Sequence, residues 1–207
     1  APGEEDFALP LYIANGITGI RDAGALRTLP EQQRVAAATL RGERIGPRLV
    51  LAGALIDGPS GSWPGQMVAA TPDEGRARVR EAQAAGWGFI KSYSLLAEDT
   101  YLAIADEAQQ RRLPLFGHVP ESVRLDTAVR AGHRSVEHFG RITQACSTAE
   151  AAMIAANAAA LRTSEPMPAW MKVMAGHNKT TFDHWDAALC ARVTRQLAQA
   201  GTAVMPS

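Results

Sequence analysis

Three polar residues, Lys91, His118 and His138, could form a reactive centre because each ends or interrupts an apolar run typical of a buried strand. They are separated by 27 and 20 residues, and each separation is close to the length of one strand-plus-helix unit. The spacing therefore predicts three side chains at the same end of neighbouring parallel strands. A lysine buried there must be paired, neutral or modified, and two imidazoles beside it are a natural pair of divalent-metal ligands.

Taken singly, each of these residues also has a structural interpretation. A histidine at the end of a strand is often a hydrogen-bonded core residue, and a lysine at a strand end can extend its amine to water. Their co-location in three successive units favours a functional site over those interpretations.

The elements that must position these residues follow one theme, in which a short apolar run rich in β-branched residues precedes an Ala-rich helix pattern. The sequence predicts strands at 16–22, 48–56, 88–94, 114–119, 134–139 and 202–206. It predicts helices at 4–15 and from Thr71, the latter ending at Gly86. This alternation favours an α/β fold with a parallel sheet, and no GxGxxG or P-loop motif supports a nucleotide-binding fold.

The length favours an incomplete (β/α)8 TIM-type barrel. A whole barrel has about 250 residues, or roughly 31 for each unit. Six predicted strands in 207 residues, beginning with a helix and ending on a strand, correspond to about six units without the first and last strands. We therefore expect one barrel domain over residues 1–207, cut at both ends; the start at Ala1-Pro2-Gly3, without Met, suggests a mature form or an excised piece.

Two long connections follow strand ends. Residues 57–71 are predicted as a loop carrying Trp63, and residues 140–201 as an insertion with helices at 148–162 and 184–200 around a loop at 163–183. In a parallel barrel such loops lie on the catalytic face, although surface insertions that contribute nothing to a site are the alternative.

The segments GITGIRDAG, FIKSYSLL, RRLPLFGHVPE and AGHRSVEHFGRI resemble the amidohydrolase superfamily, most closely its imidazolonepropionase-like and dipeptidase-like members, from about Leu11 to Met205. The resemblance implies a barrel with one or two divalent metals, commonly zinc. It implies that Lys91 is carbamylated and bridges two metals, and that His118 and His138 bind the second. It also implies hydrolysis of an amide or cyclic amide bond in a small-molecule or dipeptide substrate.

The sequence also departs from that family. It contains no His-x-His, which the family carries on its first strand, and the family's final strand with its Asp would lie beyond Ser207. Weak or absent metal binding is therefore expected for these 207 residues alone. Two other functions stay open: a Schiff-base lyase or aldolase using Lys91, and a non-catalytic binding domain.

Further candidates surround the three residues. Arg21 could bind a substrate carboxylate, or form a structural contact with Asp22. Tyr93 could orient substrate or stabilise an oxyanion, or only pack in the barrel mouth. Glu137 is expected to face the helices, away from His138, in a buried ion pair.

Several residues are expected to be structural or solvent-exposed. His133 is placed before its strand, at the end opposite the site, and His177 and His184 are predicted to be solvated. A cluster in the long insertion could form a lid, a satellite core or an oligomer contact: Pro166, Pro168, Trp170 and Met171.

Composition limits the partners and the compartment. Twenty-one basic residues balance 21 acidic ones, so nucleic-acid and anionic-membrane binding are not expected, and no apolar stretch reaches the length of a membrane span. Cys146 and Cys190 are either a disulfide or two buried thiols. A disulfide would favour a periplasmic or secreted protein, and thiols a cytoplasmic one.

Overall fold

The computed structural model of the chain describes residues 4–22, 28–61 and 63–206. Residues 23–24 of the first family-like segment, and the first three residues, lie outside this part. The described strands are β1 (Gly19–Asp22), β2 (Arg48–Leu51), β3 (Leu55–Asp57), β4 (Met67–Val68), β5 (Ile90–Ser92), β6 (Leu115–Gly117), β7 (His133–Glu137) and β8 (Ala203–Met205).

Helices fill most of the sequence between these strands. In chain order they are α1 (Glu4–Ala14), α2 (Leu29–Leu40), α3 (Pro72–Ala84), α4 (Glu98–Gln110), α5 (Leu125–Arg130), α6 (Gly140–Ala145), α7 (Glu150–Ala160), α8 (Pro166–Met174), α9 (His177–Asp183) and α10 (Ala187–Ala200). The helix predicted at 4–15 is α1, and the helix predicted from Thr71 is α3, whose cap is the Thr71 hydroxyl accepting from the Glu74 amide.

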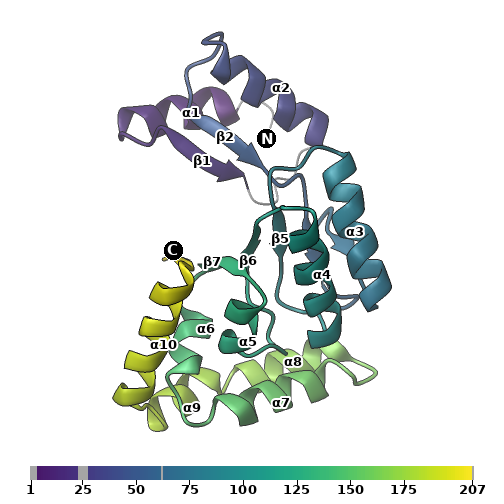
Figure 1. Cartoon of the computed structure of the whole chain (residues 1–207), viewed down its shortest axis with the longest axis vertical. Helices are drawn as coiled ribbons and strands as arrows, with labels where there is room; N and C mark the ends of the chain where they lie inside the picture. The colour runs from purple at the N-terminus through teal and green to yellow at the C-terminus, as the bar shows by residue number, and fades with distance from the viewer. Residues whose placement is uncertain (1–3, 23–27, 62, 207) are drawn as a thin grey trace.

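The strands form a partial parallel barrel, as predicted. In the described chain, β1 pairs with β2, and a six-stranded sheet has the order β4-β3-β5-β6-β7-β8, with every pairing parallel. The two sheets follow one another along an arc, with α3, α4, α5 and α10 on its outer side; β1 and the C-terminus lie near its two ends, on the same side of the view (Figure 1).

Two of the predicted boundaries are wrong. The strand predicted at 48–56 is divided into β2 and β3 because Gly53 has φ +77°, a conformation that interrupts the extended backbone. The predicted loop at 57–71 includes the short strand β4, whose Met67 lies in register with Ile56 of β3.

The two faces of the sheet differ in chemistry. Ile90, Leu115 and Val136, which alternate toward the helices, are each at most 3% exposed and belong to the main apolar core. The opposite face carries Lys91, Phe116 and Ser135, which lie side by side in the registers of β5, β6 and β7. The core therefore lies between sheet and helices, and the polar residues point to the inner side of the arc.

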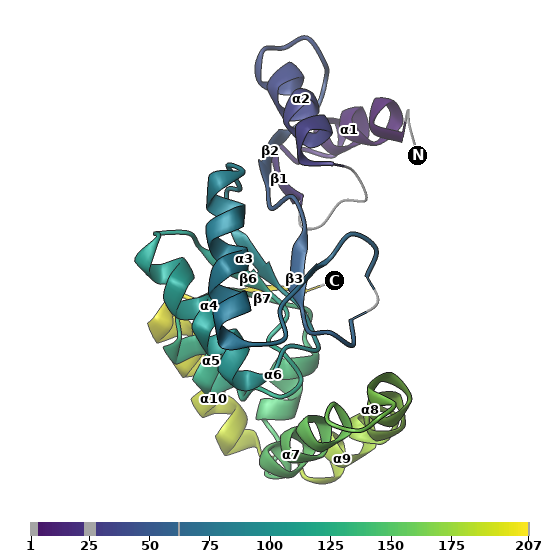
Figure 2. The same cartoon turned by 90° about the vertical axis from the view of Figure 1, so that its right-hand side faces the viewer.

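The insertion between β7 and β8 is helical almost throughout. The predicted loop at 163–183 is wrong, because it contains α8 and α9. Figure 2 shows α7, α8 and α9 together at the end of the molecule opposite α1 and α2. In the described part of the chain, no helix combines the length and apolar character that crossing a membrane requires.

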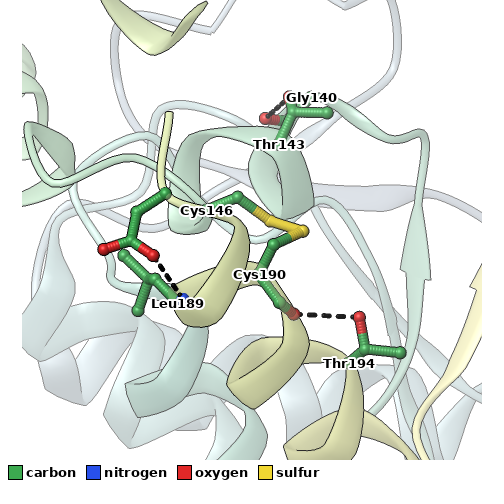
Figure 3. The surroundings of a disulfide bond; sticks show 7 residues. Gly140, Thr143, Cys146, Leu189, Cys190 and Thr194 are labelled. Carbon is green, nitrogen blue, oxygen red and sulfur yellow. Dashed lines mark hydrogen bonds between the residues drawn. A yellow bond between two sulfur atoms is a disulfide. The ribbon is translucent and has the colours of Figure 1, made fainter. Parts of the chain in front are cut away.

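A disulfide closes this insertion. Cys146, at the end of α6, is bonded to Cys190 of α10, with the two Cα atoms 4.3 Å apart (Figure 3). The interpretation as two free thiols is therefore wrong. A bridge over 44 residues contributes about 4 kcal/mol by restricting the unfolded chain.

Candidate functional site

Lys91 lies in the middle of β5, between Leu55 of β3 and Phe116 of β6. Burial lowers the pKa of its amine, and nearby Arg21 lowers it further, whereas Glu137 and Asp22 act in the opposite direction. The lysine is thus shifted toward its neutral form, in which nitrogen is a nucleophile.

His118 follows β6 and is tied to the end of β5. Its amide donates to the Ser92 carbonyl at 3.1 Å, and its ring Nδ1 lies 2.8 Å from the Ser94 hydroxyl. Burial lowers the pKa of this imidazole to about 3, so the ring is neutral. Since Nδ1 is used, and Nε2 has no hydrogen-bond partner among the described residues, Nε2 is the nitrogen that can bind a ligand.

His138 reaches the same place by a different backbone conformation. It follows Glu137, the last residue of β7, and strand alternation alone would turn it toward the helices. Its φ of +66° changes that direction, and its amide donates to the Met205 carbonyl at 2.9 Å. Its exposed ring meets the His118 ring edge-on, with the ring centres 4.9 Å apart.

Aromatic rings line the site beside the imidazoles. Tyr93 stacks on His118 with the ring centres 4.2 Å apart, and Trp63 lies 6.0 Å from Tyr93. The Lys91 amine is 5.9 Å from the centre of the Tyr93 ring. The structure therefore brings Lys91, Tyr93, His118 and His138 together at one end of β5, β6 and β7.

The imidazoles of His118 and His138 have the chemistry of metal ligands but would supply only part of a donor set. A neutral imidazole with one nitrogen oriented by a second residue is the usual form of a histidine ligand, and the Ser94 contact provides that orientation. However, the described residues contain no group of three His, Cys, Asp or Glu side chains that could hold a metal ion.

Arg21 and Glu137 form an ion pair inside the arc. The Arg21 guanidinium is 3.2 Å from the Glu137 carboxylate and 3.2 Å from the Ser135 hydroxyl, and it covers the Phe116 ring at 4.4 Å. The ion pair of Glu137 was predicted, but its direction was wrong, because residue 137 shares the inner face with Ser135. Both charges line a cavity of about 570 Å³ with Arg48. Carboxylate binding by Arg21 stays a prediction.

The remaining histidines have structural surroundings. His133 is fully buried and is the first residue of β7 rather than the one before it. His177 was predicted to be solvated, which is wrong: it is 4% exposed, and its Nδ1 lies 3.3 Å from the Gln144 amide. His184 is exposed, as predicted.

The cluster proposed as a lid belongs to α8. Pro166 lines a cavity of about 670 Å³ together with Ser60 and Ser122, so α8 begins on the side of the sheet where the loop after β3 lies. Met171 is exposed. Nothing in these contacts places the cluster over the imidazoles.

One buried acid near the site was missed from the sequence. Asp57 ends β3, is 1% exposed, and accepts the Leu95 amide at 2.7 Å. Burial raises its pKa to about 6. The sequence Asp-Gly-Pro indicates a turn, in which an aspartate is usually exposed. Only the place of Asp57 at the end of an apolar run could have indicated that it is buried.

No protein-family profile and no curated protein matches the sequence, but solved structures do. Bottromycin amidohydrolase is similar to this chain, with a TM-score of 0.56 and 19% identity. The similarity covers 93% of this chain and 50% of the bottromycin amidohydrolase chain. A proposed prolidase from Bifidobacterium longum has a TM-score of 0.58 and 19% identity over 99% and 55% of the two chains. For A. niger ochratoxinase the TM-score is 0.56 and the identity 16%, and the similarity covers 98% of this chain and 54% of the ochratoxinase chain.

The chain has the fold of part of an amidohydrolase barrel. It spans about half the length of the solved structures that it matches. The partial barrel expected from the strand count is thus confirmed by the pairing of the strands and by these structures.

Proposed function

We propose that this chain is the site-bearing part of an amidohydrolase that cleaves an amide, cyclic amide or dipeptide bond. The observation that carries the proposal is the convergence of His118 and His138 beside Lys91, with ring centres 4.9 Å apart, at one end of three neighbouring strands. The names of the similar structures, which include a Xaa-Pro dipeptidase and molinate hydrolase, support this class of reaction.

Lys91, His118 and His138 would hold a divalent metal, with zinc as our expectation. When bound, the metal would polarise the scissile carbonyl and lower the pKa of water. Lys91 would join the donor set by carboxylation, in which its neutral amine adds to CO₂ and loses a proton, so that a cation becomes an anionic oxygen ligand. The lowered pKa of its amine favours that reaction.

The other residues near the site have roles that need no further group. The Ser94 hydroxyl holds the His118 ring by its Nδ1, and Tyr93 covers one face of that ring against water. The Tyr93 hydroxyl would orient the substrate carbonyl, and Arg21 would bind a substrate carboxylate if Glu137 gave way.

The test uses the longest native polypeptide that contains these residues, because the chain spans only half the length of similar structures. We expect bound zinc by elemental analysis and hydrolysis of Xaa-Pro dipeptides or N-acyl amino acids. Lys91→Ala should lose both, and added short carboxylates should partly restore them. Full activity in Lys91→Ala, or a complete chain without metal, would overturn the proposal. The 207-residue chain alone should bind zinc weakly or not at all.

A Schiff-base lyase is the second candidate, favoured by the partly buried amine of Lys91 with its lowered pKa. Borohydride should then trap a carbonyl substrate on Lys91, and chelators should leave the activity unchanged.

The compartment is also a proposal. The Cys146–Cys190 bond favours an oxidising compartment, such as the periplasm or the cell exterior. Detection of the bonded peptide in protein isolated from native cells, alkylated before lysis, tests it.

A further inference from the structure

Asp57 is a buried acid that no step of the proposed function uses. In the described part of the chain its hydrogen-bond donors are backbone amides, those of Leu95 and Gly58, and no arginine or lysine pairs with it. A buried carboxylate is costly, and two amide donors offset only part of that cost. Its position between two loops indicates that its role is to hold them.

The first of these loops follows β3, and its described residues, 58–61 and 63–66, are called segment 58–66. Gly58 lies so close to the Leu95 carbonyl that a side chain there would collide with it. The space beside Gly61 is filled by the second carboxylate oxygen of Asp57 and by the Gln66 amide. The carboxylate therefore lies where segment 58–66 passes segment 93–97, which is the second loop.

The two segments are joined by a pair of rings, and one of these rings, Tyr93, contacts His118. From segment 58–66, Trp63 lies 6.0 Å from Tyr93. From segment 93–97, Tyr93 stacks on His118 at 4.2 Å, and the Ser94 hydroxyl is 2.8 Å from its Nδ1. The residue after Ser94 is Leu95, whose amide is the one held by Asp57 at 2.7 Å. The Asp57 carboxylate thus holds the segment that touches the imidazole on its face and on its Nδ1, together with the Ile56 carbonyl, which accepts the Tyr93 amide at 3.0 Å.

We propose that Asp57 is a positioning residue for the His118 imidazole. From the end of β3 it holds the Leu95 amide, and in this way it fixes Tyr93 and Ser94 against the ring. The Nε2 atom of His118 is thereby directed toward the site. The inference rests on the proposed function only for the reason why Nε2 should be oriented, which is to bind a metal. The contacts themselves can be tested in the 207-residue chain without metal or substrate.

The experiment is NMR of the chain with ¹⁵N-labelled histidine, at a fixed pH near 7. In the unmodified chain we expect nuclear Overhauser effects between the Tyr93 and His118 rings, a ring-current displacement of the His118 protons, and a single His118 tautomer protonated on Nδ1. Asp57→Ala should lose the displacement and mix the tautomers. Asp57→Asn should retain both, because its amide oxygen still accepts from Leu95.

Two controls separate this role from general stabilisation. Glu150→Ala removes another buried carboxylate, whose oxygen lies 3.4 Å from the Leu125 amide, and it should leave the His118 signals unchanged. The signals of His133, bonded to Tyr101, should not move in Asp57→Ala. Gly58→Ala leaves the carboxylate but pushes Leu95 away, so it should reproduce the His118 changes. This variant therefore keeps the test available if Asp57→Ala does not fold.

Unchanged His118 signals in folded Asp57→Ala or Gly58→Ala would overturn the proposal. So would the absence of Tyr93–His118 effects in the unmodified chain, a measurement that requires no variant. None of these results depends on hydrolysis or metal binding, so a failure of the proposed function is distinguishable from a failure of this inference.

Discussion

Two tyrosine–histidine pairs lie close to the same parallel sheet but in different surroundings. Tyr101 of α4 and His133 of β7 are fully buried, whereas Tyr93 and His118 follow the last residues of β5 and β6 and are partly exposed. Burial lowers the pKa of both imidazoles, to about 4 for His133 and about 3 for His118. A lowered pKa therefore does not tell which of the two histidines belongs to a functional site.

The hydrogen bonds of the two rings separate them. Both nitrogens of His133 are used: Nδ1 lies 2.9 Å from the Tyr101 hydroxyl, and Nε2 lies 3.2 Å from the Gly117 carbonyl. His118 uses Nδ1, and its Tyr93 neighbour contacts it by ring stacking. A ring with both nitrogens bonded joins elements of the fold, whereas a ring with one nitrogen not bonded within the described residues can bind a ligand there.

Replacing the two histidines should give the largest difference. His133→Ala leaves a cavity in the core and a buried Tyr101 hydroxyl without its partner, so we expect a loss of about 3–5 kcal/mol in the free energy of unfolding. His118→Ala, at a half-buried position, should cost about 1 kcal/mol. Urea unfolding of both variants measures the difference, and equal losses would contradict the comparison.

Lowering the pH should destabilise the protein through His133. In the unfolded chain its pKa is the usual 6.5 and in the folded chain about 4, so the unfolded state binds more protons between these values. Stability therefore falls as the pH drops from 6.5 to 4, by about 3 kcal/mol from this residue. The raised pKa of Asp57 acts in the opposite direction between pH 6 and 4.

The contribution of His133 is isolated by comparing unfolding free energies of the unmodified chain and His133→Leu at several pH values. The variant should lose this part of the pH dependence. Parallel curves for the two proteins would show that His133 is not kept neutral by the fold.

Of the two tyrosines, Tyr101 should also contribute more to the free energy of unfolding than Tyr93. Tyr101→Phe removes the hydroxyl that meets Nδ1 of His133 in a fully buried position, and a buried polar atom without its partner costs about 1–3 kcal/mol. Thermal or urea unfolding gives the value. A loss below the error of the measurement would mean that this hydrogen bond is replaced by another.

The sequence predicted the strands that carry the site better than the contacts within it. Apolar runs interrupted by Lys91 and His118 are visible in the sequence, because a core strand rarely contains such residues. Alternation from Ser135 gives the inward direction of Glu137, whereas the turn at His138 depends on a positive φ at that residue, which alternation does not predict. Helices α8 and α9 were missed because Pro166, Pro168 and Gly176 are typical of loops, although proline is tolerated in the first turn.

Asp57 was missed for a further reason: its partner, the Leu95 amide, is 38 residues away, and only the pairing of β3 with β5 brings them together. The same holds for the Tyr93–His118 stack, which joins residues of two different strand ends. Contacts of this kind follow from the register of the strands, and the register is not readable from periodicity alone.

The smallest effect on stability is expected for Tyr93→Phe. Within the described residues the Tyr93 hydroxyl has no hydrogen bond, and the ring stack on His118 at 4.2 Å does not need it, so the unfolding free energy should change by less than about 0.5 kcal/mol. In the complete enzyme the result divides the two roles given to Tyr93. If its hydroxyl stabilises charge on the substrate oxygen, kcat should fall about 100-fold with little change in KM. An unchanged kcat in this variant, with intact His118 ring signals, would show that Tyr93 acts only by packing against the imidazole. Tyr101, in contrast, acts on His133 through its hydroxyl.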